Sequence, residues 1–245
     1  QANITQMFSA PIPQGFDPLA FYRGLRLKNP ATFAAYMDYG SVQIASSSPE
    51  RLLRHDGTTV EARPIKGTRR RDSDPARDAN LIAALTSSRK DRAENVRIVD
   101  LLRNDLSRVS KPGTVKVTVL CGLETYANVH HLVSVITSEL KEGDGVGELI
   151  GATFPGGSIT GAPKIRAMEI IAEIEQAPRG VYCGTIGYIG FNGRTDLNIA
   201  IRTAQFHDGV ARVQGGGGIT ARSQPAAEYE ESLTKIKRIM EAFRP

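Results

Sequence analysis

The sequence predicts a globular protein that contains both strands and helices. Polar and apolar residues alternate weakly in 1–8, and 114–120 is β-branched, which is typical of strands. In 79–109 and 226–243, apolar residues recur every three or four positions, as in helices with one buried face. The chain has 245 residues, 40% of them hydrophobic, and 24 glycines. This is enough for a substantial core with many tight turns, so we expect one large domain, or two closely packed halves, over residues 1–245.

The first third of the chain is expected to be mainly β. Residues 1–8 predict a strand, 18–25 a short helix, and 33–46 two strands joined by a turn near 38–41. A further short strand, 58–62, leads to the sequence Arg-Pro-Ile-Lys-Gly-Thr at 63–68. The charged segment 69–78 is expected to be a loop.

The rest of the chain alternates helices and strands. A helix over 79–109 should bury Ile98, Leu102 and Leu106, and strands should follow at 114–120 and 128–136. A second helix opens at Pro163, three strands lie within 184–214, and a last helix covers 226–243. The expected buried faces of these two helices are Ile165, Met168, Ile171 and Ile174 in the first, and Leu233, Ile236, Met240 and Phe243 in the second.

Charge and composition disfavour several classes of protein. The net charge is +5, but basic residues are dispersed apart from 69–71, and there is no tryptophan, so nucleic-acid binding is not favoured. A positive balance serves equally to attract a small anionic substrate. No apolar run is long enough to span a membrane and no segment resembles a signal peptide, so we expect a cytoplasmic protein. Cys121 and Cys183 are too few for a disulfide framework or a thiolate zinc site.

Lys66 is a candidate nucleophile. Pro64 and Gly67 place it on a short, stiff segment, and Thr68 follows with a hydroxyl group. A lysine amine reacts only when it is neutral, which requires burial or a neighbouring cation. The alternative is a solvated lysine in a surface turn.

Two glycine-rich stretches could hold an anion. Residues 154–164, Phe-Pro-Gly-Gly-Ser-Ile-Thr-Gly-Ala-Pro-Lys, combine exposed backbone N–H groups with two hydroxyl groups ahead of a helix. The spacing matches neither a P-loop nor a dinucleotide-binding motif, and a plain turn is the alternative. The run of four glycines at 215–218 either brings backbone donors close to a ligand or forms a flexible bend.

Two predicted helices each carry an acidic pair on one face. Asp91 and Glu94 form the first pair, and Glu228 and Glu231 the second. Facing each other, such pairs could bind Mg²⁺ together with an anionic ligand, although solvated helix faces are the alternative. Glu50 is a candidate acid. These features indicate an enzyme that acts on a small carboxylated molecule.

Five motifs in this order closely resemble a known family. They are 64–68 (Pro-Ile-Lys-Gly-Thr), 131–134 (His-Leu-Val-Ser), 154–164, 182–188 (Tyr-Cys-Gly-Thr-Ile-Gly-Tyr) and 216–218. The family is that of the chorismate-utilising enzymes, which includes anthranilate, aminodeoxychorismate, isochorismate and salicylate synthases. The resemblance implies an α+β fold, with two antiparallel sheets sandwiched and covered by helices, and a site in the cleft between halves. Members usually have a further N-terminal segment, and since the chain opens at Gln1 in mid-strand, we expect a fragment or a processed form.

Lys66 decides the expected branch of the family. Anthranilate synthases resemble this chain at 64–68 but carry alanine in place of Lys66, whereas aminodeoxychorismate synthases carry lysine. Isochorismate and salicylate synthases use a lysine base near the position of Gln1. The resemblance is therefore greatest to component I of aminodeoxychorismate synthase. Anthranilate synthase component I, isochorismate synthase and a truncated, catalytically idle chorismate-binding domain remain as alternatives.

The resemblance also implies a mechanism and partners. Lys66 would add covalently to chorismate while Glu50 protonates the departing hydroxyl, and ammonia from a glutaminase subunit would then replace the lysine. A separate lyase would complete the route to p-aminobenzoate and folate. The implied ring-pocket and carboxylate-binding residues are His131, Thr160, Thr68, Tyr182, Arg202, Gly216, Gly218 and Lys235, and the implied Mg²⁺ ligands are Glu94, Glu231, Asp91 and Glu228.

Overall fold

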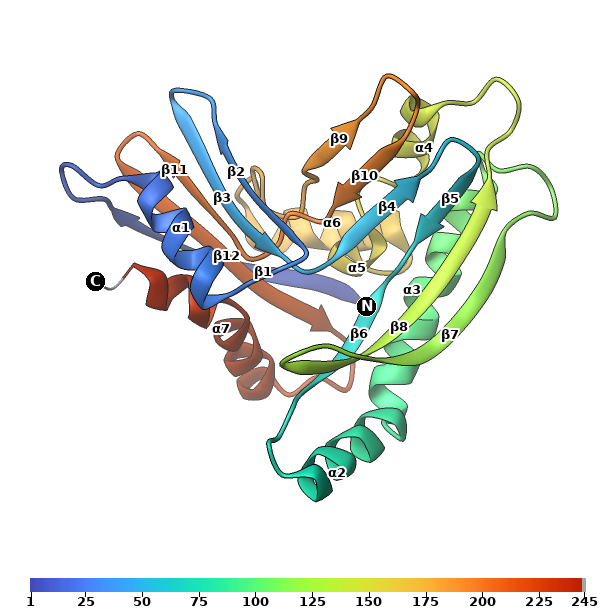
Figure 1. The fold of residues 1–245 in the computed structure, drawn as a ribbon, viewed down its shortest axis with the longest axis horizontal. Coiled ribbons are helices and arrows are strands. Elements are labelled where there is room, and N and C mark those ends of the chain that lie inside the picture. Colours follow the sequence, from blue (N-terminus) through green and yellow to red (C-terminus); the bar gives the residue numbers. More distant parts are fainter. Residues whose placement is uncertain (244–245) are drawn as a thin grey trace. The chain divides into compact units, whose positions relative to one another are not determined.

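The computed structural model describes residues 1–243 and divides the chain into two compact units (Figure 1). Unit 1 contains Gln1–Glu50, Ile159–Gly187 and Leu197–Pro245, and unit 2 contains Arg51–Ser158 and Tyr188–Asp196. Each unit is built around one antiparallel sheet with helices against it, which confirms the α+β class. No helix among the described residues has the length and apolar character that crossing a membrane requires.

Unit 1 contains a five-stranded sheet in the order β1-β12-β11-β3-β2. Its strands are β1 (Ala2–Pro11), β2 (Phe33–Asp38), β3 (Val42–Ser48), β11 (Thr203–His207) and β12 (Val210–Ile219). Helices α1 (Pro18–Lys28) and α7 (Pro225–Ala242) cover one face (Figure 1). Between them and the sheet lies an apolar core that contains Phe21, Leu25, Phe206, Ile236 and Ile239. The strand pair at 33–46, the helix at 18–25 and the last helix are thus confirmed.

The four-glycine run is part of a regular strand rather than a bend. Residues Gly215 to Gly218 pair in unbroken register with Asn3 to Gln6 of β1. A Cβ atom on Gly215 would lie 2.8 Å from Cγ2 of Ile236 and 2.9 Å from the carbonyl oxygen of Ser232, both on α7. Because glycine has no side chain, α7 can lie directly on the strand at this point.

The outer edge of β1 is closed by two side chains of the same unit. Thr5 donates its backbone N–H to Oε1 of Glu175 at 2.8 Å. Arg179 donates to the carbonyl oxygen of Asn3 at 2.6 Å and binds Glu175 at the same distance. The backbone groups that an edge strand normally leaves free are therefore occupied along this stretch.

The helix that follows Pro163 differs from its expected packing. Helix α6 (Lys164–Glu175) exists, but Ala167 is its buried residue, whereas Ile165 and Ile174 are 77% and 58% exposed. Met168 is also exposed. The helix contacts β1 along one narrow line, so the periodicity predicted the helix correctly but not the side that is covered. Similarly, α7 buries Ile236 and Ile239, while Met240 is 42% exposed.

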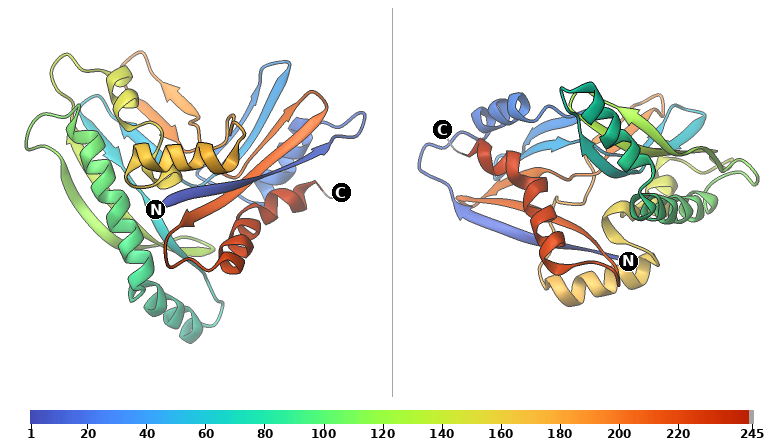
Figure 2. Two further views of the ribbon diagram at one scale, coloured as in Figure 1. Left: turned by 180° about the vertical axis from the view of Figure 1, so that it is seen from behind. Right: turned by 90° about the horizontal axis from the view of Figure 1, so that it is seen from below.

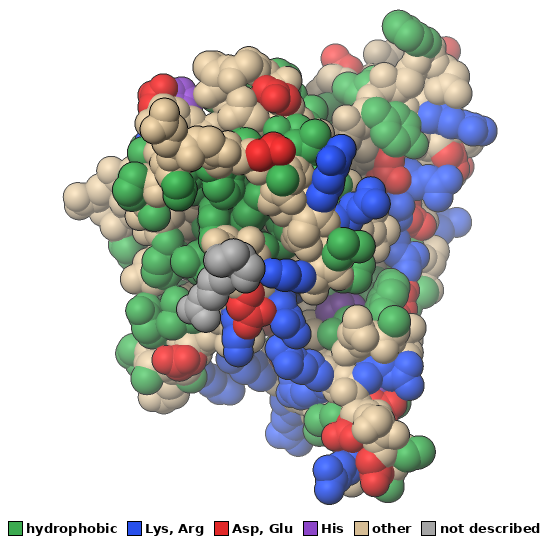
Figure 3. Space-filling view, turned by 60° about the vertical axis from the view of Figure 1, so that its left-hand side comes forward, with side chains coloured by type: hydrophobic (Ala, Val, Ile, Leu, Met, Phe, Trp, Pro, Cys, Tyr) green, Lys and Arg blue, Asp and Glu red, His purple; other side chains and the backbone are tan. Residues whose placement is uncertain are grey.

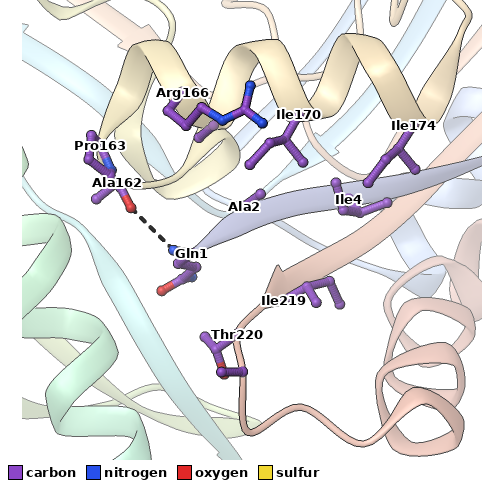
Figure 4. A pocket seen from close by; sticks show the side chains of 12 residues that line it. Gln1, Ala2, Ile4, Ala162, Pro163, Arg166, Ile170, Ile174, Ile219 and Thr220 are labelled. Atoms are coloured by element: carbon purple, nitrogen blue, oxygen red, sulfur yellow. Dashed lines mark hydrogen bonds between the residues drawn. The ribbon is translucent and has the colours of Figure 1, made fainter.

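A pocket of about 390 Å³ lies beside α6 in unit 1 (Figure 4). Its walls are mainly aliphatic and include Ile4, Ile170, Ile174 and Ile219. Gln1 lies at one end, where its amino group donates to the carbonyl oxygen of Ala162 at 3.2 Å.

Unit 2 contains a seven-stranded sheet in the order β6-β8-β5-β4-β10-β9, with β7 paired to β8. Its strands are β4 (Arg51–His55), β5 (Thr59–Ala62), β6 (Ile65–Arg70), β7 (Lys116–Thr125), β8 (Val129–Glu139), β9 (Gly187–Ile189) and β10 (Thr195–Asn198). Helices α2 (Pro75–Thr86) and α3 (Arg89–Ser107) pack on this sheet, and α3 runs along β7 and β8 (Figure 2). Two shorter helices follow, α4 (Val146–Thr153) and α5 (Gly157–Thr160).

Two expectations for unit 2 are corrected. The helical region 79–109 is two helices, because Ser88 caps α3 by accepting the N–H of Asp91, and the chain breaks at Ser87 and Ser88. The expected loop 69–78 is shorter, since Arg69 and Arg70 belong to β6 and Asp74 caps α2. The expected buried face of α3 is confirmed, with Ile98, Leu102 and Leu106 at most 5% exposed.

We predict that Gly215→Ala lowers the free energy of unfolding by about 1–3 kcal/mol, because the new methyl group pushes α7 off the sheet. Gly24→Ala is the matched control, since a Cβ there meets no atom within 4 Å. That substitution on α1 should raise stability by about 0.5–1 kcal/mol, because alanine favours helix. Urea denaturation of both variants measures the difference, and equal effects would contradict the close contact between α7 and β12.

Candidate active site

Lys66 lies against the acidic face of α3 in unit 2. Its Nζ is 3.0 Å from Oε1 of Glu94 and 3.4 Å from the carbonyl oxygen of Ser158. The Lys66 side chain is 15% exposed and that of Glu94 is 21% exposed. The amine therefore does not extend into bulk water, which excludes the alternative of a solvated surface lysine. The partner carbonyl of Ser158 comes from the glycine-rich stretch 154–164, which the sequence had marked but not linked to Lys66.

Gly67 allows α3 to approach this lysine. Strand β6 has an irregularity between Lys66 and Thr68, and Gly67 between them has φ +77°. A Cβ atom at Gly67 would lie 2.9 Å from Cβ of Asp91. Only glycine accommodates both the left-handed backbone and the close contact with α3. The acidic pair of α3 is thus held beside Lys66 by the backbone of β6.

The two adjacent histidines of β8 have different environments. His131 is partly exposed, and its Nδ1 is 2.9 Å from Oγ1 of Thr68. His130 is fully buried, with Thr125 at one ring nitrogen and Asp78 at the other, each at 2.9 Å. The hydrogen bond from His130 lowers the pKa of Asp78, and so does the backbone N–H of Asp72. His130 is therefore a structural histidine, and His131 is the one that pairs with Thr68 of β6.

Unit 1 supplies the second acidic pair. On α7, Glu228 is buried, whereas Glu231 is exposed and 2.8 Å from Nζ of Lys235. Lys235 also donates to the carbonyl oxygen of Gly216 at 2.9 Å. A Cβ at Gly217 would lie 3.5 Å from Oε2 of Glu228. The bare backbone of β12 thus lies directly beside these carboxylates.

Arg202 and Glu50 lie within the same part of unit 1. Arg202 has φ +51°, and its carbonyl oxygen accepts the N–H of Ser47, which lies in the buried end of β3. Burial lowers the pKa of Arg202, and the negative charge of Glu50 opposes that shift. Glu50 itself is 8% exposed, and its carbonyl oxygen accepts the N–H of Ile199. A buried guanidinium is suited to binding a carboxylate of a ligand.

Tyr182 and Cys183 are buried beside Arg179. Burial raises the pKa of Tyr182 well above its ordinary value and that of Cys183 to about 12. Both groups are therefore uncharged at neutral pH, and the cysteine is not a thiolate nucleophile. Cys121 is also a buried free cysteine.

The predicted site residues fall into two sets, one in each unit. In unit 2 the set is Lys66, Thr68, Asp91, Glu94 and His131, and in unit 1 it is Glu50, Thr160, Tyr182, Arg202, Gly216, Gly218, Glu228, Glu231 and Lys235. Within the part of the chain that the structure describes, no three His, Cys, Asp or Glu side chains group as a metal site. The Mg²⁺ site therefore stays a prediction. None of the residues in these two sets lines the pocket beside α6.

Basic side chains are prominent on the surface. On the face drawn in Figure 3, Lys and Arg side chains are more abundant than Asp and Glu, in keeping with the net charge of +5. A surface potential of this sign raises the encounter rate with anions.

Comparison with known proteins identifies the family. The sequence pattern of the family described as "chorismate binding enzyme" matches residues 1–241. The chain belongs to the chorismate-binding enzyme family. It is 50% identical over 91% of its length to an aminodeoxychorismate synthase of Streptomyces griseus, and 45% identical over 93% to anthranilate synthase component 1 of Aquifex aeolicus. The crystal structure of anthranilate synthase component I from Streptococcus pneumoniae matches 97% of the chain with a TM-score of 0.88 and 38% identity.

The chain spans only part of each of these proteins. It covers 31% of the Streptomyces protein, 46% of the Aquifex protein and 52% of the Streptococcus chain. Since overall identity to the two kinds of synthase is similar, identity alone does not separate them, and the residues of the site have to be considered.

We predict that Gly67→Ala destabilises this chorismate-binding enzyme more than Gly113→Ala does. Both glycines have φ near +78°, at +77° and +79°, but a Cβ at Gly113 meets no atom within 4 Å. The control variant therefore loses only the backbone preference, about 1–2 kcal/mol, whereas Gly67→Ala also displaces Asp91. Chemical denaturation of the two variants gives the comparison, and indistinguishable midpoints would show that α3 does not press on β6.

Proposed function

We propose that this chain is the chorismate-converting part of an aminodeoxychorismate synthase, which replaces the C4 hydroxyl of chorismate with an amino group. The observation that carries the proposal is the position of Lys66, partly buried and within 3.0 Å of Glu94, in a family in which this residue distinguishes the branches. The chorismate substrate is supported by the family match over residues 1–241. The component I relatives favour a separate partner subunit, and we propose that it is a glutaminase that supplies ammonia.

In the proposed reaction, the neutral Lys66 amine forms a bond to C2 of the chorismate ring. The ring double bonds shift, and the C4–O bond breaks as Glu50 gives a proton to the leaving hydroxyl, which departs as water. Ammonia then forms a bond at C4, the double bonds return, and the Lys66 amine is expelled. Two simpler substitutions thus replace one difficult substitution. A separate lyase would release p-aminobenzoate from the product.

The remaining groups bind and orient the substrate. Arg202, Tyr182 and the backbone of Gly216 and Gly218 are assigned to the enolpyruvyl carboxylate, since a buried guanidinium and bare backbone donors suit an anion. His131 and Thr160 are assigned to the wall of the ring pocket. Thr68 holds the His131 ring through its hydroxyl group.

Two acidic pairs fit the chemistry of Mg²⁺, which takes one or two protein carboxylates and keeps open positions for an anionic ligand. We assign Glu94 and Glu231 as ligands, with Asp91 and Glu228 in support. Bound there, the ion would supply positive charge to hold the ring carboxylate of chorismate. In the structure, Nζ of Lys66 lies 3.0 Å from Oε1 of Glu94, and Nζ of Lys235 lies 2.8 Å from Oε1 of Glu231.

Anthranilate synthase is the second candidate, favoured by the similarity to proteins of that name. Incubation of the protein with chorismate, Mg²⁺ and an ammonium salt separates the two activities. We expect a product that yields p-aminobenzoate only after a lyase is added. Direct formation of anthranilate would refute the assignment.

We predict that Lys66→Ala removes a covalent adduct that the unaltered protein forms with chorismate. Mass spectrometry of the protein quenched during turnover should locate the adduct on Lys66. Lys164→Ala is the control, because it removes a lysine outside the proposed reaction and should leave the adduct in place. If Lys66 remains unmodified during turnover, the covalent scheme is wrong.

We predict that Glu94→Gln or Glu231→Gln lowers activity at least about 10²-fold, because each removes a charge proposed to hold the metal and the substrate. A titration of activity with Mg²⁺ should show a higher half-saturating concentration in both variants. Glu230→Gln, next to Glu231 on α7, is the control and should leave the titration unchanged. An unaltered Mg²⁺ response in Glu94→Gln would place the metal elsewhere.

A further inference from the structure

Ser134 of β8 is fully buried and connects three elements of unit 2. Its backbone N–H donates to the carbonyl oxygen of Pro64 at 3.2 Å, two residues before Lys66. Its Oγ accepts the N–H of Cys121 on β7 at 2.9 Å and donates to Oδ1 of Asn95 on α3 at 2.5 Å. The Ser134 side chain therefore joins an irregular point of β7 to the middle of α3, while its backbone N–H holds the start of β6.

Asn95 completes the connection at the level of Lys66. It has no exposed surface and donates through Nδ2 to the carbonyl oxygen of Leu132 at 3.3 Å. Leu132 is the residue directly opposite Lys66 in the pairing of β6 with β8. Asn95 also follows Glu94 immediately in α3. Asn95 and Ser134 therefore connect the helix that carries Glu94 to the strands next to Lys66.

This attachment allows only one placement of α3. Leaving a buried amide or hydroxyl without its partner is costly, so a helix that slid or rotated on the sheet would lose both hydrogen bonds of Asn95. Apolar contacts such as those of Ile98 and Leu102 tolerate small shifts, because dispersion has no directional requirement. Directional bonds at Asn95 are therefore suited to fixing the position of the neighbouring carboxylate.

We propose that Asn95 and Ser134 are positioning residues that hold Glu94 against Lys66. Their role in catalysis rests on the proposed function, whereas their control of the Lys66 environment does not. Without them, α3 keeps its apolar contacts but loses its fixed position, and Lys66 loses its carboxylate partner. Because the Lys66 side chain is then no longer held against α3, its amine becomes more accessible to reagents from solution.

The test compares Asn95→Ala, Ser134→Ala and the control Leu106→Ala. Leu106 is also fully buried on α3 but lies three turns away from Glu94. Competitive acetylation with acetic anhydride, read by mass spectrometry, reports the reactivity of Lys66 in the folded protein relative to exposed lysines. We expect a severalfold rise in both test variants and none in the control, measured where urea melts show each variant folded. Ser134→Cys, which keeps a weak donor of similar size, replaces any variant that fails to fold and should give a smaller rise.

Turnover of chorismate with ammonia adds a second readout. A misplacement of about 1 Å can cost about 10²-fold in rate, so we expect kcat to fall by that order in both test variants with little change in KM. The fall in kcat of the double variant Asn95→Ala with Ser134→Ala should be smaller than the product of the two single falls, because both single variants remove the same Ser134–Asn95 hydrogen bond.

The outcomes separate this inference from the proposed function. If Lys66 reactivity is unchanged, or rises equally in Leu106→Ala, the positioning role is wrong. If reactivity rises as expected but the unaltered protein does not convert chorismate with ammonia, the proposed function fails and the positioning of Lys66 stands. If the fall in kcat of the double variant equals the product of the two single falls, the two residues do not act through their shared hydrogen bond.

Discussion

The close approach of α3 to β6 is the constraint on which the chemistry of unit 2 depends. A lysine and a glutamate on neighbouring elements come within 3.0 Å only because the residue after the lysine has no side chain. Gly67 has a left-handed backbone, and Asp91 lies directly against it, so a residue with a side chain at this position would both strain the backbone and push α3 away. Unit 1 uses the same principle, since the bare backbone of β12 lets α7 and its carboxylates lie directly on the strand. In both units, glycine creates the space in which charged side chains gather.

Local patterns predicted most of the elements. The strand pair at 33–46, the first helix and the buried face of α3 follow from residue periodicity and turn signals, which depend only on near neighbours. Apolar periodicity alone does not show the break between α2 and α3, which Ser87 and Ser88 indicate through the preference of serine for helix caps. The run of four glycines is compatible with either a bend or a close approach, and only its pairing with β1, more than 200 residues away, determines that it is a regular strand.

The packing of α6 could not be predicted in this way. Its isoleucines have helical spacing, yet Ile165 and Ile174 are exposed, because periodicity shows that a helix has an apolar face but not what lies against that face. The residues of the candidate site show the same limit. A motif indicated Lys66, helical spacing indicated Glu94, and the family resemblance implied Arg202. Ser134 stands in the motif 131–134 and Asn95 in none, and no pattern in the sequence indicates that these two residues form a hydrogen bond. Their importance arises from partners that only the fold brings into contact.

The ion pair of Glu175 and Arg179 along β1 has a further consequence. Its two members occupy the N–H of Thr5 and the carbonyl oxygen of Asn3, which face outward from the last strand of the sheet. A foreign strand could join the sheet at this point only by first displacing a salt bridge that is mostly shielded from water. This stretch is therefore protected against intermolecular β-pairing by side chains of its own chain, without the help of proline or a bulge.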